Sequence, residues 1–398
     1  MPVAMEKESS TRGRPSWRPI EETEARAALR ARGSKLDDLR ARARDLRDKG
    51  RGRRITFSPK AFLPLTNLCL DRCAYCTFRR DEGDADAWTM RLAEVRTWSE
   101  RARATGCIEA LFCLGDRPED AFPGHRRFLD EMGSPSTIHY TARACAVALE
   151  CGLLPHSNPG LMDGDALDLL KPVNASLGMM LESTSTRLRG PGECHYYAPD
   201  KEPSRRLAVL EAAGERRIPF TTGLLIGIGE TLDERIDALL ALADCQRRHG
   251  HLQEVILQSF RAKPEIPMAS TGEPDDDDLA RLVAVARLLF GPEINLQVPP
   301  NLSAPESLPY LLESGINDLG GISPLTPDYV NPEAPWPHLK ALARLCSRAG
   351  YELAPRLPIY DEFIDRPGFL APEMCAAVGR ARDELQPHVR LGAEEATA

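Results

Sequence analysis

Strand-like and helix-like segments alternate along most of this chain. Eight short apolar segments, each suited to a buried strand, are separated by segments whose apolar residues recur at helical spacing. The expected strands are residues 62–65, 108–114, 153–156, 175–181, 219–226, 254–260, 294–298 and 316–319. Repeated strand-helix units with short connections favour a parallel sheet, and eight of them predict an α/β fold with a single closed (βα)8 barrel of the TIM type.

Both ends of the chain differ from this pattern. Of the 398 residues, 1–54 are expected to form an N-terminal extension, 55–360 the barrel and 361–398 a C-terminal tail. The extension is polar up to about Trp17, and this first segment is expected to be disordered. Residues 21–49 are rich in Ala, Leu, Arg and Glu, which predicts one surface helix. Its arginines alternate with aspartates, a pattern more typical of a solvated helix face than of a site for RNA or an acidic protein.

The composition is that of a water-soluble enzyme. Hydrophobic residues make up 42% of the chain and charged residues 28%, and no run of about 18 apolar residues is long enough to cross a membrane. The first residues lack the apolar core of a secretion signal, and 11 cysteines, an odd number, argue against a disulfide scaffold. We therefore expect a cytoplasmic protein. A net charge of −8 disfavours nonspecific binding of nucleic acid.

Three cysteines, Cys69, Cys73 and Cys76, directly follow the first expected strand. In a barrel this position is a loop at the C-terminal mouth, where catalytic groups gather. One loop with this spacing can wrap a 4Fe-4S cube, and three thiolates leave the fourth iron open for another ligand. Structural zinc needs four ligands, usually as two separated pairs, and neither Cys107 nor Cys113 forms a second pair with zinc-like spacing.

Other polar or glycine-rich residues follow the expected strands and should meet at the same mouth of the barrel. Gly115 and Asp116 follow the second strand, and Glu182 follows the fourth. Gly227 and Gly229 follow the fifth. Their Gly-x-Gly pattern is a weak match to a dinucleotide-binding loop, because the third glycine and the later acidic residue are not in the required context. The same glycines also fit a tight turn between a strand and a helix.

The cysteine spacing, with Tyr75 directly before the last cysteine, resembles the signature of the radical S-adenosylmethionine enzymes. This resemblance implies that the amino acid end of S-adenosylmethionine binds the open iron, and that reductive cleavage yields methionine and a 5'-deoxyadenosyl radical. It also implies a set of contacts to S-adenosylmethionine: Tyr75, Gly115, Asp116, Glu182, Lys201, Gly227 and Ile228. Asp116 departs from the family, which often has a second glycine there. Lys201 stands where related enzymes have an arginine, so the charge is kept without the bidentate fork.

A narrower resemblance rests on several short strings. They are residues 58–62, 153–160, 172–176, 260–264, 299–303 and 320–328. Together they resemble the CofG-type subunit of 7,8-didemethyl-8-hydroxy-5-deazariboflavin (FO) synthase. The resemblance implies a radical cyclisation in coenzyme F(420) biosynthesis, in which 5-amino-5-(4-hydroxybenzyl)-6-(D-ribitylimino)-5,6-dihydrouracil closes to FO with loss of ammonia. It further implies a CofH-type partner subunit that delivers this substrate, and a reductant such as ferredoxin or flavodoxin.

Amide, hydroxyl and charged side chains near the strand ends are the candidate substrate contacts. They are His156, Asn158, Asn174, Gln258, Arg261, Asn301, Ser303 and Asp318. Each of them could instead cap a helix or bond within its own loop. Two related functions stay open, a futalosine-route menaquinone cyclase and a CofH-type transferase, because both would share the cluster and the barrel. From another class, a zinc-stabilised binding module would use the basic N-terminal helix to recruit RNA or an acidic protein.

Overall fold

Eight parallel strands close into a barrel in the computed structural model, which describes residues 17–395 and, for side chains, residues 17–385. The barrel strands are β1 (Arg54–Pro64), β2 (Glu109–Cys113), β3 (Leu154–Asn158), β4 (Ser176–Gly178), β5 (Phe220–Ile226), β6 (Leu252–Ser259), β7 (Asn295–Gln297) and β8 (Asp318–Ile322). Neighbouring strands pair in parallel, and β1 pairs with both β2 and β8, which closes the sheet. The predicted (βα)8 barrel is confirmed.

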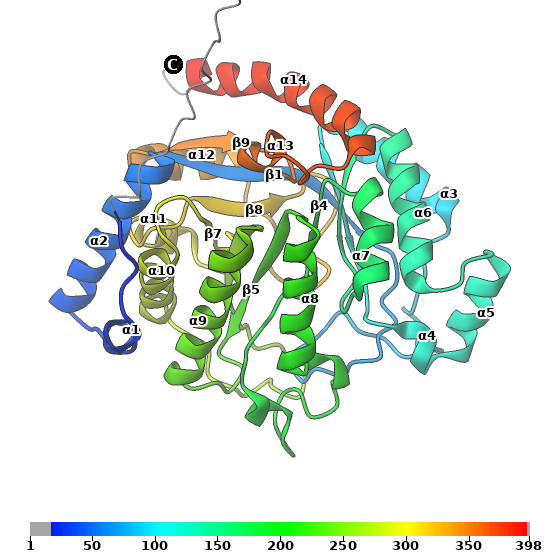
Figure 1. Cartoon of the computed structure of the whole chain (residues 1–398), viewed down its shortest axis with the longest axis horizontal. Coiled ribbons are helices and arrows are strands. Elements are labelled where there is room, and N and C mark those ends of the chain that lie inside the picture. Colours follow the sequence, from blue (N-terminus) through cyan, green and yellow to red (C-terminus); the bar gives the residue numbers. More distant parts are fainter. Residues whose placement is uncertain (1–16, 396–398) are drawn as a thin grey trace, which may run out of the picture.

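Helices follow the strands and surround the barrel (Figure 1). They are α3 (Leu92–Ala104), α4 (Pro118–Ala121), α5 (Pro123–Glu131), α6 (Thr137–Glu150), α7 (Gly164–Leu170), α8 (Pro203–Glu215), α9 (Leu232–His249), α10 (Asp276–Phe290), α11 (Leu308–Leu312) and α12 (Leu339–Arg348). Local signals fix several helix ends. α9, for example, begins with a capping box between Thr231 and Glu234 and ends at Gly250 in the left-handed conformation.

A ninth strand, β9 (Glu352–Pro355), lies outside the predicted set. It pairs in parallel with residues Arg54–Phe57 at the start of β1, whereas β2 pairs with the later part of β1. β9 therefore extends the N-terminal end of the barrel. Directly after it, Arg356 forms ion pairs with Asp318 (Nε to Oδ2, 2.6 Å) and with Glu254 (Nη2 to Oε1, 2.7 Å). These buried pairs close the barrel at the end opposite the three cysteines.

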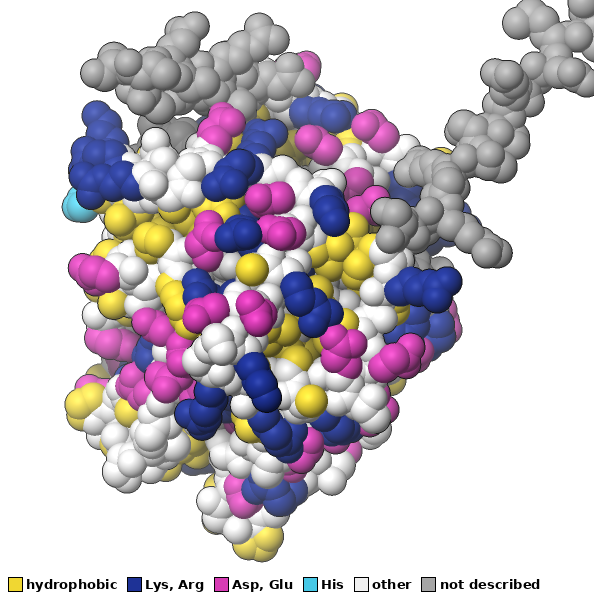
Figure 2. All heavy atoms as spheres, turned by 90° about the vertical axis from the view of Figure 1, so that its left-hand side faces the viewer, with side chains coloured by type: hydrophobic (Ala, Val, Ile, Leu, Met, Phe, Trp, Pro, Cys, Tyr) yellow, Lys and Arg dark blue, Asp and Glu magenta, His cyan; other side chains and the backbone are white. Residues whose placement is uncertain are grey.

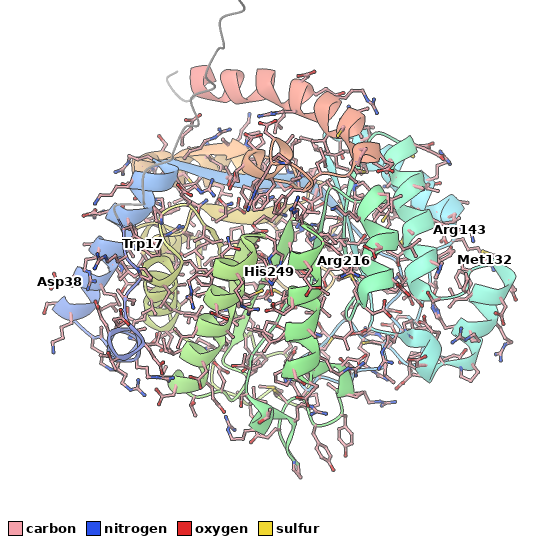
Figure 3. All side chains as sticks on the ribbon, viewed as in Figure 1. Trp17, Asp38, Met132, Arg143, Arg216 and His249 are labelled. Carbon is pink, nitrogen blue, oxygen red and sulfur yellow. The ribbon has the colours of Figure 1, made fainter. Side chains whose placement is uncertain are left out.

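The N-terminal extension forms two helices, α1 (Glu22–Ala28) and α2 (Ser34–Arg51), so the prediction of a single helix is wrong. Gly33 separates them at a φ of 54°, a left-handed conformation that does not continue a helix. α2 packs against α10, which is consequently buried on nearly every side. Trp17 lies against Gly291 at the end of α10, on the same side of the molecule (Figure 3). The disorder predicted before Trp17 lies outside the described residues.

The arginines of α2 are largely paired with acidic or aromatic partners. Arg42 and Arg44 form ion pairs with acidic residues of α1 and of the segment after α11. Arg47 is fully buried and donates to the Tyr351 hydroxyl at 2.7 Å, so it does not belong to the solvated face that the sequence predicted. Figure 2 faces this side of the molecule and shows basic and acidic side chains intermixed over it.

The C-terminal tail packs across the N-terminal end of the barrel. α13 (Asp361–Ile364) and α14 (Pro372–Glu395) follow β9, and α14 runs along the upper edge of the molecule in Figure 1. Phe363 of α13 shares an apolar cluster with Leu154 at the start of β3. The division of the chain into extension, barrel and tail stays a prediction. Within residues 17–395, no helix has both the length and the apolar character that a membrane crossing requires.

Candidate active site

The three predicted cluster ligands lie on the loop after β1, here called the cysteine loop (residues 65–80). They are Cys69, Cys73 and Cys76, and they line one cavity of about 350 Å³ at the C-terminal mouth of the barrel. The loop after β2 approaches the cysteine loop closely. A Cβ atom at Gly115 would lie 1.9 Å from a carbonyl oxygen of the cysteine loop, so glycine is required at this contact. The Asp116 backbone N–H then donates to the Cys69 Sγ at 3.2 Å.

The three cysteines are free and suit a cluster. Burial raises the pKa of Cys69 to about 12 and that of Cys73 well above its ordinary range. Binding of iron therefore requires loss of the thiol protons, which a bound cation favours. Among the residues described, no three His, Cys, Asp or Glu side chains converge on the point that a single metal ion would occupy. A cube binds each thiolate through a different iron atom, and three free cysteines on one loop fit that requirement.

The loop after β4, residues 183–200, covers the outer side of the cysteine loop. Two backbone N–H groups of the cysteine loop donate to its carbonyl oxygens at 2.9 Å. The Tyr75 hydroxyl forms a further hydrogen bond of 2.9 Å with the His195 Nε2. Burial lowers the pKa of His195 to about 2, so the ring is neutral near pH 7. The sequence reading selected Tyr75 but not His195, because no local spacing indicates a partner 120 positions away.

Glu182 and Lys201 form an ion pair on the cavity wall, with 2.8 Å between Oε1 and Nζ. Glu182 adopts a left-handed conformation at a φ of 65°, and its N–H donates to the Gly223 carbonyl of β5 at 3.0 Å. The Lys201 side chain is only 13% exposed, unlike a solvated lysine at a helix start. Burial and Arg206 lower the pKa of Lys201, but Glu182 and Cys73 outweigh them and raise it above its ordinary value.

Asp116 lines the same cavity, although its side chain is turned toward the loop after β3. Both carboxylate oxygens lie 3.2 Å from the Leu161 N–H, which donates to them. Gly160, at a φ of 85°, leaves room for this carboxylate, because a Cβ there would lie 2.3 Å from the Asp116 Cγ. Burial, and then the neighbouring Asp200, raises the pKa of Asp116 to about 7. The backbone N–H of Asp116 faces Cys69, and the S-adenosylmethionine contacts expected of Gly115 and Asp116 stay predictions.

Gly227 and Ile228 lie beside the cavity without lining it. Their backbone N–H groups donate to the two carboxylate oxygens of Glu230, at 2.8 and 2.9 Å. Arg235 pairs with the same carboxylate at 2.6 Å. Ile228 is buried in an apolar cluster against which Tyr75 packs. The S-adenosylmethionine contacts expected of these two residues stay predictions.

The candidate substrate residues do not form one group. Asn158, Gln258 and Arg261 line the cavity. Arg261 also lines a neighbouring hollow, together with Asn301 and Ser303. Arg261, Asn301 and Ser303 therefore lie together, but Asn301 and Ser303 line the neighbouring hollow and not the cavity with the cysteines.

The remaining candidates lie elsewhere. His156 faces the barrel interior, where its Nδ1 bonds to the Ser176 hydroxyl at 2.6 Å. Asn174 precedes β4 and bonds to the Leu170 carbonyl at 3.0 Å. Asp318 is the first residue of β8 and pairs with Arg356 at the closed end of the barrel. None of these three lines the cavity, so their positions do not favour contact with a ligand there.

The cavity also contains polar residues that the sequence reading did not select. They are Lys60, Asp71, Arg79, Arg206, Ser259, Lys263, Gln297, Asp328 and Asn331. Lys60 and Gln297 lie within strands, whereas the sequence prediction considered mainly residues that follow strands. Alternation along β1 is the signal that could have found Lys60, because Ser58, Lys60 and Phe62 point to the same side of the strand.

The loop after β8, residues 323–337, covers one side of the cavity. Trp336 stacks on Phe62 with ring centroids 5.2 Å apart. The buried Lys263 reaches across from the loop after β6, and its Nζ donates to the Asn331 Oδ1 at 2.8 Å. The cysteine loop therefore lies between the loop of residues 183–200 and the loop of residues 323–337.

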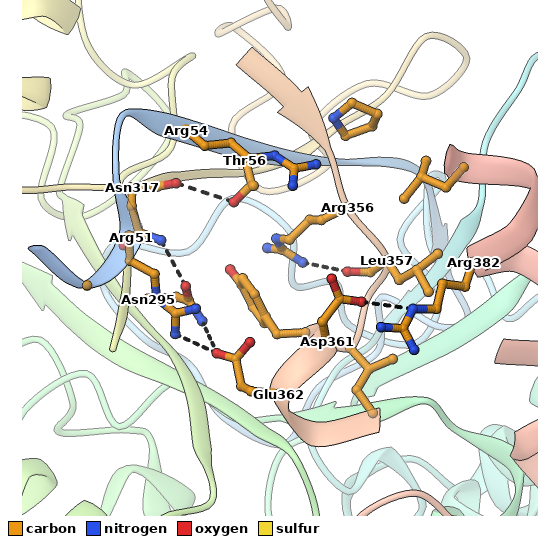
Figure 4. A pocket seen from close by; sticks show the side chains of 15 residues that line it. Arg51, Arg54, Thr56, Asn295, Asn317, Arg356, Leu357, Asp361, Glu362 and Arg382 are labelled. Carbon is orange, nitrogen blue, oxygen red and sulfur yellow. Dashed lines mark hydrogen bonds and ion pairs between the residues drawn. The ribbon is translucent and has the colours of Figure 1, made fainter. Parts of the chain in front are cut away.

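A second cavity, of about 520 Å³, lies at the N-terminal end of the barrel (Figure 4). Its charged side chains largely pair with one another, as Arg382 does with Asp361 at 3.4 Å. Arg356 lines this cavity and not the one with the cysteines. Catalytic groups of such barrels gather at the C-terminal mouth, so the cavity with the cysteines is the candidate active site.

Comparisons with known proteins agree with this geometry. The sequence model of a family described as the Radical SAM superfamily matches residues 63–242, which include the cysteine loop, Glu182 and Lys201. The solved structure of the FeFe-hydrogenase maturase HydG from Carboxydothermus hydrogenoformans is similar with a TM-score of 0.68 and 20% identity, over 84% of this chain and 76% of that one. At this identity the likeness shows a shared fold.

Two curated relatives are much more similar. The chain is 46% identical over 391 residues to the FO synthase of Streptomyces avermitilis, which is 95% of this chain but 44% of that protein. It therefore spans less than half the length of that relative. It is 45% identical over 335 residues to the 7,8-didemethyl-8-hydroxy-5-deazariboflavin synthase of Methanothermobacter thermautotrophicus, covering 84% of this chain and 98% of that protein. The chain belongs to the 7,8-didemethyl-8-hydroxy-5-deazariboflavin synthase family of radical S-adenosylmethionine enzymes, which work with a 4Fe-4S cluster and S-adenosylmethionine.

Proposed function

We propose that this chain is the lyase that closes the deazaflavin ring of FO. The substrate is the hydroxybenzyl adduct of ribityliminodihydrouracil, and the products are FO, ammonia, 5'-deoxyadenosine and methionine. The observation that carries the proposal is the alignment with 98% of the Methanothermobacter synthase, so that the whole of a named synthase corresponds to this one chain. The cavity at the barrel mouth supports it, because it combines the three cysteines with charged and amide side chains.

In this proposal Cys69, Cys73 and Cys76 hold the cluster. The wall that carries Glu182 and Lys201 holds S-adenosylmethionine. Its amino acid end is a zwitterion, so the Glu182 carboxylate suits the ammonium and the Lys201 ammonium suits the carboxylate. When bound, the cluster and S-adenosylmethionine supply a radical that can abstract a hydrogen atom from a carbon that no acid or base activates.

The protein's own task is to hold the substrate beside that position and to keep water away from it. Two loops support this role: the loop of residues 183–200 bonds to the cysteine loop and holds it in place, and the loop of residues 323–337 lines the cavity. The Tyr75–His195 hydrogen bond keeps an aromatic ring fixed next to the cluster ligands. His156, an early candidate for proton acceptor, is already engaged with Ser176, which favours a structural role for it.

The proposal includes a CofH-type partner that makes the adduct and a reductant of the ferredoxin or flavodoxin type. The longer FO synthase supports the first of these. Since the chain covers 44% of that protein, more than half of it lies outside the alignment, which is enough for a second enzyme of this size. A cytoplasmic location remains part of the proposal.

The alignment with the longer FO synthase favours one alternative function. Because the name FO synthase describes the whole of a longer protein, this chain could correspond to the tyrosine-consuming transferase of the CofH type. The two functions use different substrates. The ring-closing enzyme needs only the preformed adduct, whereas the transferase needs tyrosine and a ribitylaminouracil.

The test is anaerobic turnover by the protein after reconstitution with iron and sulfide. Dithionite and S-adenosylmethionine are supplied with either the adduct or the transferase substrates, and 5'-deoxyadenosine and FO fluorescence are followed. Both signals with the adduct alone are the expected result. Deoxyadenosine formed only with tyrosine and the ribitylaminouracil would overturn the ring-closing proposal. Cys73→Ala should abolish both signals, whereas Cys375→Ala, at an exposed position on α14, should keep them.

A further inference from the structure

Five polar side chains that line the cavity have no hydrogen-bond partner within the described part of the chain: Asn158 of β3, Ser259 and Gln258 of β6, Lys60 of β1 and Gln297 of β7. Lys60, Gln258 and Gln297 lie on the arc of the barrel that β6, β7, β8 and β1 form. Gln297 is only 8% exposed as a residue, and its amide lines the cavity without a hydrogen bond. Buried amides rarely remain in that state, because each unpaired group costs about 1–3 kcal/mol. The buried Gln253 illustrates the usual outcome, since its amide bonds to Thr221 and to Pro358.

Two adjacent glycines of β8 make room for two of these side chains. A Cβ at Gly320 would lie 2.2 Å from the Gln297 Nε2. A Cβ at Gly321 would lie 1.3 Å from the Lys60 Cε and 2.2 Å from its Nζ. Gly320 also has a φ of 69°, which a side chain would strain. The glycine pair therefore has a specific effect: it lets an ammonium and an amide pass over the strand into the cavity.

The Lys60 ammonium is held in the cavity without being neutralised by a close contact. Its Nζ is 3.7 Å from the Glu109 Oε1, beyond hydrogen-bond distance, and 5.0 Å from the centroid of the Phe62 ring. The Lys60 side chain is 15% exposed, whereas that of Glu109 is 4% exposed, so the lysine is the member of the pair that reaches the cavity. Its three N–H donors remain available to a ligand.

Lys60, Gln258 and Gln297 lie on a different arc of the barrel from the proposed S-adenosylmethionine contacts, whereas the unpaired Asn158 lies on β3, next to β4. Lys60, Gln258 and Gln297 are on β1, β6 and β7, and the glycine pair between them is on β8. Glu182 and Lys201 follow β4, and strand order places β4 across the barrel from β8 and β1. The cavity therefore has two sides of different chemistry, and only one of them is accounted for by the cofactor.

We infer that Lys60, Gln258 and Gln297 bind the pyrimidinedione ring of the substrate. This inference rests on the proposed function and deepens it. Such a ring presents carbonyl acceptors and an N–H donor along one edge. A primary amide can meet a carbonyl and an N–H together, since it carries both a donor and an acceptor, and an ammonium strengthens a contact to a further carbonyl oxygen. Three separate strands would then hold the ring in one orientation.

The inference is tested by binding, without reductant and without turnover. The probe is FO, whose fluorescence is titrated with the reconstituted protein. Gln297→Leu and Lys60→Met should each weaken FO binding about tenfold, as expected for loss of one hydrogen bond to a buried polar or charged group. Gly321→Ala should do the same while keeping every polar group, because its methyl group displaces the flexible end of Lys60. Lys340→Met, on the outer helix α12, is the matched control and should bind FO as the unmodified protein does.

Competition identifies the part of the ligand that is recognised. A ribitylaminouracil should displace FO from the unmodified protein, and ribitol alone should not. Competition by ribitol and not by the uracil would overturn the inference, and so would unchanged FO affinity in both Gln297→Leu and Lys60→Met. Absence of FO binding by the unmodified protein would overturn it as well. Failure of the proposed function would look different, because the unmodified protein would then bind FO but not convert the adduct.

Discussion

The Lys201 ammonium lies 2.8 Å from the Glu182 carboxylate, on the wall of the cavity that the three cysteines line. A zwitterionic amino acid can replace this contact, because its own charges satisfy both side chains. Lys201→Met should therefore raise the KM for S-adenosylmethionine about tenfold or more. Iron content should not change. The measurement is 5'-deoxyadenosine formation against S-adenosylmethionine concentration. Lys201→Arg, which keeps the charge, should retain most of the affinity, and an unaltered KM in Lys201→Met would contradict the assignment.

Gly115→Ala should weaken cluster binding without touching a cysteine. The added methyl carbon would lie 1.9 Å from the Leu68 carbonyl oxygen and 2.6 Å from the Cys69 Cβ, so the cysteine loop must move. We expect less iron and sulfide per chain after reconstitution and a lower melting temperature. Gly272→Ala is the control, because a Cβ there meets no atom within 4 Å. Full cluster content in Gly115→Ala would show that the close approach is not needed.

Tyr75→Phe should destabilise the fold by leaving the His195 Nε2 buried without its partner. An unsatisfied buried group costs about 1–3 kcal/mol, which in a chain of this size lowers the melting temperature by a few degrees. The double variant Tyr75→Phe with His195→Phe should recover part of this loss, since both polar groups are then removed. Thermal melting of Tyr75→Phe, of His195→Phe and of the double variant measures the effect. If the losses of the two single variants simply add, the hydrogen bond contributes no coupling.

Glu254 should make stability depend on pH. Burial raises its pKa from 4.5 to about 7, with Arg356 opposing this shift and Asp318 adding to it. A carboxyl whose pKa is higher in the folded state contributes stability at low pH, and that contribution is lost as the pH rises through the folded-state value. Glu254→Gln lacks this dependence. The melting temperature of the unmodified protein should therefore fall relative to that of the variant between about pH 5 and about pH 8. If the melting temperatures of the two proteins change by the same amount over that pH range, the raised pKa of Glu254 is refuted.

The barrel could be predicted because its signals are repeated. Each strand is a short apolar run and each helix has an apolar face, and errors at single boundaries do not alter the alternation. β9 lacks such a signal. It has four residues, begins with the exposed Glu352 and ends at a proline, so only its pairing with β1 defines it as a strand. Gly33 was missed for a related reason, because one glycine did not outweigh the helix-favouring residues on both sides.

The site was predicted best where a residue lies within four positions after the end of a strand. Gly115, Asp116 and Glu182 all line the cavity with the cysteines, as expected from barrel geometry. For Asp318, the assumption that the residue lies at the C-terminal end of its strand was wrong. The predicted strand ended at residue 319, whereas β8 runs from Asp318 to Ile322, so this carboxylate lies at the opposite end of the strand. The predicted strand also ended before Gly320 and Gly321, whose role in admitting Lys60 and Gln297 depends on strand register that a single sequence does not contain.

The ion pairs of Arg356 have a consequence for the route that ligands take. They fill the N-terminal end of the barrel, so the cavity is approached from its C-terminal mouth, where the cysteine loop lies. In the proposed arrangement the pyrimidinedione and S-adenosylmethionine use opposite sides of this cavity. Both ligands, and the products formed from them, must then enter and leave through the same mouth.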